Sequence, residues 1–333
     1  MKKHFLYIVP ALLFALISCG NSSNTATVAP LDEVTATIKA PDFNGDSAYA
    51  YVKAQCDFGP RIPNGTAHDK CGDWLVQKFT ELGATVTEQK DNVKAWDGTS
   101  LKMRNIIASY KPESGKRVMI CAHWDSRPWA DNDPDPKNHH TPIDGADDGA
   151  SGVGIMVELA RQFQKQMPEI GVDLICFDME DYGTPDWYEG EHDDKSWCLG
   201  SQYWSHTPHT AGYNARYGVL LDMVGNRNSS FYQEYFSTRY AKSIVKKVWN
   251  KAGDMGMGGR FPKKDGGAIT DDHIPINEIA KIPCIDIIPM YPDCKESSFG
   301  PTWHTLSDNI SNIDPATLQM VGQVLMEVIY NEH

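Results

Sequence analysis

The sequence CAHWDSRPWADNDPDPKNHHTPIDGADDGASG, residues 121–152, decides the fold that we predict for this chain. It overlaps an apolar run, residues 118–122, with the composition of a buried strand. His123 and Asp125 end that run, and a loop rich in Pro, Asp and His then leads to Gly-Ala-Asp-Asp-Gly at 145–149. The pattern beyond is helical. This order is typical of an α/β protein that places ligands at the carboxyl edge of its sheet.

Strands and helices alternate on both sides of this stretch. We predict helices over residues 46–57, 66–82, 149–166, 201–206, 237–252 and 314–330, and strands over residues 84–89, 103–110, 117–122, 172–177, 217–224 and 283–288. The sequence has neither an internal repeat nor a linker in its middle. It therefore predicts a single α/β domain, in which a mostly parallel, mixed and twisted sheet is covered by helices on both faces.

The start of the chain is typical of an export signal. Residues 1–18 combine a short basic start with an apolar segment too short to span a bilayer, and we predict a lipoprotein signal peptide. Cys19 would be the lipidated residue after cleavage; an ordinary signal peptide with a chance cysteine is the alternative. Residues 19–44 have the polar composition of a flexible tether, and residues 45–333 are the predicted catalytic domain. We expect an exported protein, anchored to a membrane and facing the periplasm.

Charge and cysteine content limit the partners further. The net charge of −13 argues against nucleic acid and against a polybasic membrane surface. A pairing of Cys56 with Cys71, or of Cys198 with Cys294, stays open, because export permits disulfides and spacing does not settle them. No CxxC spacing indicates a cysteine zinc site. Nothing in the sequence indicates an oligomer, so we expect a monomer.

Polar side chains follow several predicted strands. They are His123 and Asp125, Asp148 at a helix start, the pair Glu180 and Asp181, Asp222, and His304. Each alone is weak evidence, since a His-x-Asp is more often a loop hydrogen bond and an acidic pair is usually solvated. Together they predict one site. Histidine and carboxylate ligands without sulfur suit a catalytic zinc ion, which needs about three protein ligands and an open position.

Six motifs then resemble one family. They are AHWDS (122–126), GADDGASG (145–152), FDMED (177–181), LLDMVG (220–225), TDDHIPI (270–276) and TWHTLSD (302–308). The motifs are similar to those of the zinc-dependent aminopeptidases of family M28 and, within it, of the animal-type glutaminyl cyclases and their bacterial relatives. The resemblance extends over roughly residues 45–331. It implies a zinc-aminopeptidase-like fold, of the kind also called phosphorylase/hydrolase-like.

The resemblance implies a metal site and its surroundings. Asp148, Asp181 and His304 match the ligands of a single Zn²⁺ ion. His123 matches a ligand of a second metal in two-zinc aminopeptidases, and Asp125 would orient His123. In the animal cyclases a glutamate stands at the position of Asp181, so the metal or the backbone must shift to suit the shorter side chain.

The remaining roles also come from the resemblance. Glu180 matches the catalytic acid/base, and Asp222 and Asp271 match two carboxylates of a proton-handling network. Trp303 matches an aromatic wall of the substrate pocket. Asp286 stands where the animal enzymes have a histidine. The structural alternatives are a strand-end cap for Asp222, a surface acid for Asp271 and a core aromatic for Trp303.

The activity implied is conversion of an N-terminal glutamine of a peptide or protein into pyroglutamate, with release of ammonia. The nucleophile is the substrate's own α-amine, which agrees with the lack of an evident Ser-His-Asp or Cys-His arrangement. Zinc would polarise the γ-amide, and Glu180 would transfer the proton.

Two other functions remain as alternatives. A two-zinc aminopeptidase would use Glu180 to activate water, and all of its ligand types are present: His123, Asp148, Asp181, Asp222 and His304. A lipid-anchored binding protein without catalysis is the other, and the intact Glu180 argues against it. Trp303 directly before His304, and the extra acid in Asp271-Asp272-His273, favour the cyclase.

Overall fold

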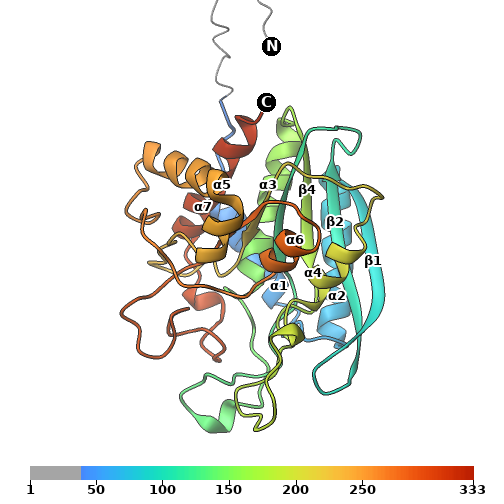
Figure 1. Cartoon of the computed structure of the whole chain (residues 1–333), viewed down its shortest axis with the longest axis vertical. Helices are drawn as coiled ribbons and strands as arrows, with labels where there is room; N and C mark the ends of the chain where they lie inside the picture. Colours follow the sequence, from blue (N-terminus) through green and yellow to red (C-terminus); the bar gives the residue numbers. More distant parts are fainter. Residues whose placement is uncertain (1–38) are drawn as a thin grey trace, which may run out of the picture. The chain divides into compact units, whose positions relative to one another are not determined.

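The computed structural model describes residues 39–333, which belong to one compact unit built on a six-stranded sheet (Figure 1). The predicted signal peptide, residues 1–18, and the predicted lipidation site Cys19 lie outside the described residues. Across residues 39–333 no helix is long and apolar enough to cross a membrane.

The sheet combines an antiparallel hairpin with four parallel strands. The strands are β1 (Thr85–Lys94), β2 (Ser100–Tyr110), β3 (Arg117–His123), β4 (Gly171–Phe177), β5 (Gly218–Leu221) and β6 (Cys284–Ile287), in the spatial order β1-β2-β4-β3-β5-β6. The pairs β1–β2 and β2–β4 are antiparallel, and the remaining pairs are parallel. The prediction of a mixed, mostly parallel sheet is confirmed. The carboxyl ends of β3 to β6 therefore meet at one edge.

Helices cover both faces of the sheet, as predicted. They are α1 (Gly45–Cys56), α2 (Thr66–Glu81), α3 (Ala150–Lys165), α4 (Leu199–His206), α5 (Tyr235–Asp254), α6 (His273–Glu278) and α7 (Pro315–Tyr330). Side chains alternate along β3: Val118 and Ile120 join the large core under α1, α2, α3, α5 and α7, whereas Met119 and Cys121 join the smaller core under α4 and α6. Two buried faces explain why these strands are apolar throughout.

The hairpin is longer than the sequence predicts. The predicted strands 84–89 and 103–110 become Thr85–Lys94 and Ser100–Tyr110, paired in register from Thr85–Ser109 to Lys94–Ser100. Most side chains of β1 are exposed and polar, so the apolar alternation that marks a half-buried strand is missing there. The strand β1 forms because it pairs along its whole length with β2, which is more buried.

The packed unit begins before residue 45. Ala40 and Phe43, which lie in the predicted tether, are buried in the main core. The backbone N–H of Phe43 donates to Oε1 of Gln323 at 2.7 Å, and its ring packs so closely on Gly322 that a Cβ there would lie 2.4 Å from it. A glycine on α7 thus makes room for this segment.

All seven cysteines between Cys56 and Cys294 are free thiols, so neither disulfide left open by the sequence is formed among the described residues. Cys121, Cys176 and Cys284 lie fully buried in β3, β4 and β6. There they pack as small apolar side chains.

Candidate metal centre

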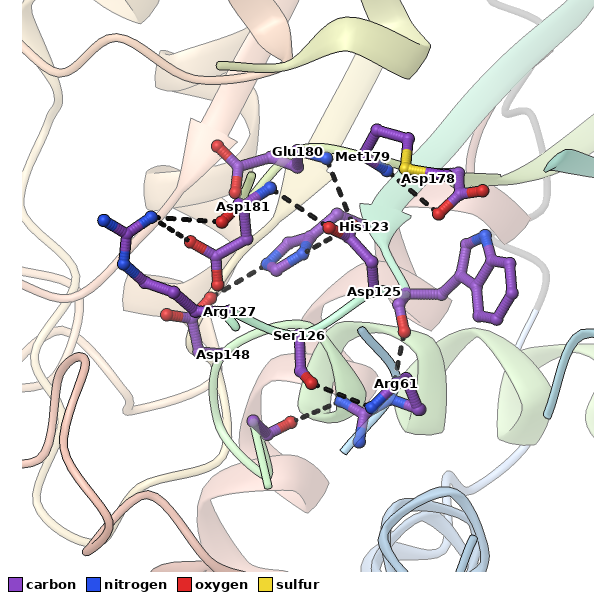
Figure 2. A network of polar contacts seen from close by, with 12 residues as sticks. Arg61, His123, Asp125, Ser126, Arg127, Asp148, Asp178, Met179, Glu180 and Asp181 are labelled. Atoms are coloured by element: carbon purple, nitrogen blue, oxygen red, sulfur yellow. Dashed lines mark hydrogen bonds and ion pairs between the residues drawn. The ribbon is translucent and has the colours of Figure 1, made fainter. Parts of the chain in front are cut away.

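The candidate site lies at the carboxyl edge of the parallel strands. His123 is the last residue of β3, Glu180 and Asp181 lie in the turn after β4, and Asp222 directly follows β5. Because these strands are parallel neighbours, their ends bring the four side chains together from distant parts of the sequence. Figure 2 shows His123, Glu180 and Asp181 close together with Asp148, which comes from the loop before α3.

A glycine beside Asp148 lets that loop approach β3. Gly149 has φ +90°, and a Cβ there would lie 2.7 Å from the carbonyl oxygen of Asp125 and 3.0 Å from Cε1 of His123. The position therefore requires glycine for both conformation and space. The backbone N–H of Asp148 donates to Oδ2 of Asp308 at 3.2 Å, which holds the ligand loop to the loop after His304.

Asp148, Asp181 and His304 form the first group that could hold a metal ion, with one ligand atom from each lying within 4.8 Å of the others. Nε2 of His304 is 3.2 Å from Oδ1 of Asp181 and 3.6 Å from Oδ2 of Asp148. Both carboxylate oxygens of Asp181 are buried without a hydrogen-bond partner among the described residues. A buried carboxylate without a partner is strongly unfavourable, so this arrangement fits a cation.

The protonation of His304 also suits metal binding. Burial and the neighbouring guanidinium of Arg127 lower the pKa of His304 to about 3. The imidazole is therefore neutral near pH 7, which is the form that coordinates a metal.

A second group of possible ligands, His123, Asp148 and Asp222, shares Asp148 with the first. Nε2 of His123 lies 2.9 Å from Oδ1 of Asp148 and 3.3 Å from Oδ1 of Asp222, and its Nδ1 lies 3.5 Å from Oδ1 of Asp125. Burial lowers the pKa of His123, but these three carboxylates outweigh burial and raise it well above its usual value. His123 is thus buried between carboxylates that favour its charged form.

Asp125 mainly supports the turn after β4. Its two carboxylate oxygens accept the backbone N–H groups of Glu180 and Asp181, each at 3.1 Å (Figure 2). Met179 in the same turn has φ +58°, a conformation that non-glycine residues rarely adopt. Asp125 therefore fixes Glu180 and Asp181, in addition to its contact with His123.

Glu180 shares a cavity of about 210 Å³ with the first ligand group. The lining residues are Asp148, Glu180, Asp181, Asp194, Trp197, Asp222, Ile269, Thr270, Asp271, Ile288, Phe299, Trp303 and His304. Burial, together with the nearby Asp181 and Asp271, raises the pKa of Glu180 well above its usual value, although His123 opposes this. Burial and Asp222 raise the pKa of Asp271 to about 7. Raised carboxyl pKa values in a small cavity are typical of acid/base catalysis.

Aromatic rings form the walls around His304. Trp303 lines the cavity and stacks on the His304 imidazole, with ring centroids 3.8 Å apart. Trp197 and Phe299 line the same cavity, and Trp197 lies nearly parallel to His304 at 6.0 Å. Sequence reasoning missed Trp197 and Phe299 because both lie outside the strands and helices, where no periodic pattern points to a pocket.

Asp286 lies within β6 and does not line the cavity. It is fully buried, and neither carboxylate oxygen has a hydrogen-bond partner among the described residues. Its Oδ2 is 4.0 Å from Nδ1 of His273, and Asp271 lies in the same group of side chains. Burial and Asp271 raise the pKa of Asp286 well above its usual value.

Comparison with known proteins gives the chain its family. It is similar to the crystal structure of Bacteroides thetaiotaomicron glutaminyl cyclase bound to N-acetylhistamine, at 57% sequence identity and a TM-score of 0.87, covering 89% of this chain and 100% of that chain. A Zn-dependent exopeptidase from Parabacteroides distasonis is 52% identical with a TM-score of 0.86, covering 88% of this chain and 100% of that chain. Resemblance to bacterial glutaminyl cyclases, and the fold that it implies, are thus confirmed.

Curated relatives match over a shorter share of their length. Glutaminyl-peptide cyclotransferase of Gloydius blomhoffii is 26% identical over 247 residues, covering 66% of this chain and 63% of the relative. The chain spans less than two thirds of the length of the first curated relatives that it matches. The model of peptidase family M28 matches residues 105–329, well over half of the chain. The chain therefore belongs to peptidase family M28.

Proposed function

We propose that this chain is a zinc-dependent glutaminyl-peptide cyclotransferase, an aminoacyltransferase that converts N-terminal glutamine into pyroglutamate and ammonia. One observation carries the proposal: Glu180 lines the same small cavity as Asp148, Asp181 and His304. The cavity of about 210 Å³ is smaller than the ~300 Å³ at which pockets for larger ligands begin, and suits one terminal residue. Similarity to bacterial glutaminyl cyclases over the whole length of the solved chains supports the same reaction.

We propose one Zn²⁺ ion, held by Asp148, Asp181 and His304. Among the described residues, the two carboxylate oxygens of Asp181 have no hydrogen-bond partner, and the imidazole of His304 is neutral; both features fit a bound cation. A donor set of oxygen and nitrogen without sulfur fits a catalytic zinc ion. A zinc ion bound there would polarise the γ-carbonyl of a substrate glutamine and stabilise negative charge on its oxygen. We propose a single ion because Asp148, Asp181 and His304 match the single-ion ligands of the cyclases that the motifs resemble.

The protein's own task is then to place the glutamine and move one proton. The α-amine of the substrate attacks the carbonyl carbon of its own γ-amide, so a carbon–nitrogen bond forms and the bond to the amide nitrogen breaks. Glu180 takes a proton from the α-amine and delivers a proton to the departing ammonia. No protein nucleophile takes part, because the two reacting groups belong to one residue of the substrate.

Asp222, Asp271 and Trp303 complete the site. Asp222 and Asp271 both line the cavity, and their pKa values are raised to about 7, so each can hold or release a proton near neutral pH. They would hold the substrate amide and support the proton transfer by Glu180. Trp303 would shape the wall against which the glutamine packs and would limit water in the cavity.

An aminopeptidase is the second candidate, because both ligand groups needed for two metals are present and a similar structure carries the name of a Zn-dependent exopeptidase. The cyclase is the first candidate because solved structures at 57% and 50% identity carry the name glutaminyl cyclase.

A paired substrate assay tests the proposed activity. Purified protein loaded with zinc is incubated with Gln-Ala and with Leu-Ala, and ammonia and free amino acids are measured. We expect ammonia from Gln-Ala and no leucine from Leu-Ala. Rapid release of leucine would establish the aminopeptidase, and no product from either peptide would favour a binding protein without catalysis.

We also propose that residues 1–18 are removed, that Cys19 carries lipid, that residues after it tether the catalytic domain to a membrane, and that this domain faces the periplasm as a monomer. The basic and apolar start of the chain supports export, and the polar stretch after it supports a tether. Growth of producing cells with radiolabelled palmitate should label the wild-type chain. The variant Cys19→Ala should stay unlabelled, and equal labelling of both would refute the assignment.

A further inference from the structure

We propose that a buried ion pair, Arg127 with Asp131, positions the metal ligands His304 and Asp181, and we call this pair the Arg127–Asp131 clasp. Both residues come from the loop rich in Pro, Asp and His that follows β3, to which the sequence gives no role. The inference rests on the proposed zinc site and concerns how firmly this chain would hold the ion.

The clasp is fixed by its own geometry. Arg127 is fully buried and Asp131 is 5% exposed. Nε and Nη2 of Arg127 donate to Oδ1 and Oδ2 of Asp131 at 2.7 and 2.5 Å, a two-bond arrangement that fixes direction as well as distance. The guanidinium also lies over the rings of Trp129 and Trp197, 5.4 and 4.6 Å from their centroids.

One side of the clasp faces His304. Oδ1 of Asp131 lies 3.5 Å from Nδ1 of His304, an electrostatic contact rather than a formed hydrogen bond. An acidic oxygen on this side favours the tautomer with its proton on Nδ1, which leaves the lone pair of Nε2 directed at Asp148 and Asp181.

The neighbouring residues of the loop hold the turn that carries His304. The backbone N–H of Asn132 donates to the carbonyl oxygen of His304 at 3.1 Å, and Oδ2 of Asp133 accepts the backbone N–H of Leu306 at 3.0 Å. His304 itself has φ +53°, which is unfavourable for a residue with a side chain. Contacts from outside the turn are therefore needed to keep it in this conformation.

The other side of the clasp holds Asp181. Nη1 of Arg127 donates to the carbonyl oxygen of Asp181 at 3.0 Å and lies 3.6 Å from its carboxylate (Figure 2). Asp131 in turn accepts the backbone N–H of Asp186 at 3.0 Å. The clasp thus connects the two ligand-bearing turns, which lie more than a hundred residues apart in sequence.

Charge explains why a pair is used and not an arginine alone. An unneutralised guanidinium this close to Asp181 would repel a metal cation and compete for the same carboxylate. Asp131 cancels that charge while leaving the hydrogen bond to the Asp181 backbone intact. Loss of the Asp131 charge should therefore weaken zinc binding both by freeing His304 and by leaving a positive charge beside the ion.

The chain offers a matched control pair. Nε and Nη2 of Arg117 donate to Asp173 at 2.6 and 2.8 Å, and the Asp173 side chain is fully buried. Arg117 and Asp173 lie at the opposite ends of β3 and β4 from the site. Asp173→Asn therefore removes the same kind of charge from the same kind of pair without touching the ligand turns.

Zinc release into excess chelator, followed with a colorimetric zinc indicator, tests the proposal without any peptide substrate. We expect Asp131→Asn to speed release by about 10- to 100-fold, the usual effect of removing a partner of a metal ligand, and Arg127→Lys to speed it less. Asp173→Asn should lower the unfolding temperature but leave the release rate unchanged. If Asp131→Asn does not fold, Arg127→Lys against Asp173→Asn still decides the question.

Unchanged release from the clasp variants, or equally faster release from Asp173→Asn, would overturn the proposal and leave the clasp a purely structural pair. A wild-type chain that binds no zinc would overturn it as well. Zinc binding without cyclisation of Gln-Ala would instead refute the proposed activity, and the release rates would still decide the role of the clasp.

Discussion

The two possible ligand groups share Asp148 but differ in the state of their histidines. In the first group, the pKa of His304 is lowered to about 3, and the two buried oxygens of Asp181 have no hydrogen-bond partner within residues 39–333. In the second group, the pKa of His123 is raised well above its usual value by the carboxylates around it. The imidazole of His304 is therefore neutral near pH 7, whereas the carboxylates around His123 favour its charged form. Similar residues a few ångströms apart can thus favour opposite protonation states.

Replacing each of the two histidines in turn should give the largest difference in zinc content. We expect His304→Ala to lose zinc and all cyclase activity, because it removes a ligand, whereas His123→Gln should keep one zinc ion per chain. Metal content by atomic absorption measures the difference. Equal zinc loss in both variants would mean that the two groups act as one two-metal site.

Glu180 allows chemistry to be separated from metal binding. The variant Glu180→Gln should reduce kcat by about 10²- to 10⁴-fold, the usual contribution of a general acid/base, while zinc stays bound. Steady-state ammonia release and metal content check both parts. Loss of zinc with loss of activity would reassign Glu180 as a ligand.

Replacing Trp303 should have a smaller effect, and on KM rather than on kcat or zinc binding. Replacing it with leucine removes an aromatic wall worth about 0.5–1.5 kcal/mol beyond simple burial, so KM should rise by about 2- to 10-fold with zinc content unchanged. A separate determination of kcat and KM on Gln-Ala tests this. An unchanged KM would mean that Trp303 does not contact the bound glutamine.

Zinc should change the pH dependence of stability. In the metal-free protein, the pKa values of Asp222 and Asp271 are raised to about 7 from 3.8, and that of His123 is raised too, so the folded state binds more protons than the unfolded state. The free energy of unfolding should then fall as the pH rises from about 4 to about 7. The lowered pKa values of His304 and His209 act in the opposite sense, but they are fewer than the raised ones.

A zinc ion bound beside Asp222 and Asp271 would favour their charged forms, so its stabilising effect should grow over the same pH range. Thermal unfolding in chelator and in zinc at pH 5, 6, 7 and 8 gives both curves. Metal-free stability that increases with pH would contradict the assigned directions of these pKa shifts.

The strand ends were the part of the site that sequence could locate. His123, Glu180, Asp181 and Asp222 each follow an apolar run, and parallel strands place such positions at one edge. The sequence also predicts the α/β class, because predicted strands and helices alternate along the chain. The edge strand β1 extends five residues beyond its prediction, because its exposed polar side chains carry no apolar pattern.

The supports of the site could not be located in this way. Arg127 and Asp131 lie in a loop whose path depends on contacts with two other loops, and Trp197 follows a third irregular segment. The sequence predicts a polar tether at Phe43. The burial of this residue depends on the space left at Gly322, which the local sequence does not indicate. Such residues are placed by tertiary packing, which local periodicity does not record.

The most direct test is to count and locate the zinc. Native mass spectrometry of the zinc-loaded chain, with anomalous diffraction at the zinc edge, should give one ion, bound by Asp148, Asp181 and His304 beside Glu180. An ion bound by His123, Asp148 and Asp222, alone or as a second ion, would contradict the central claim.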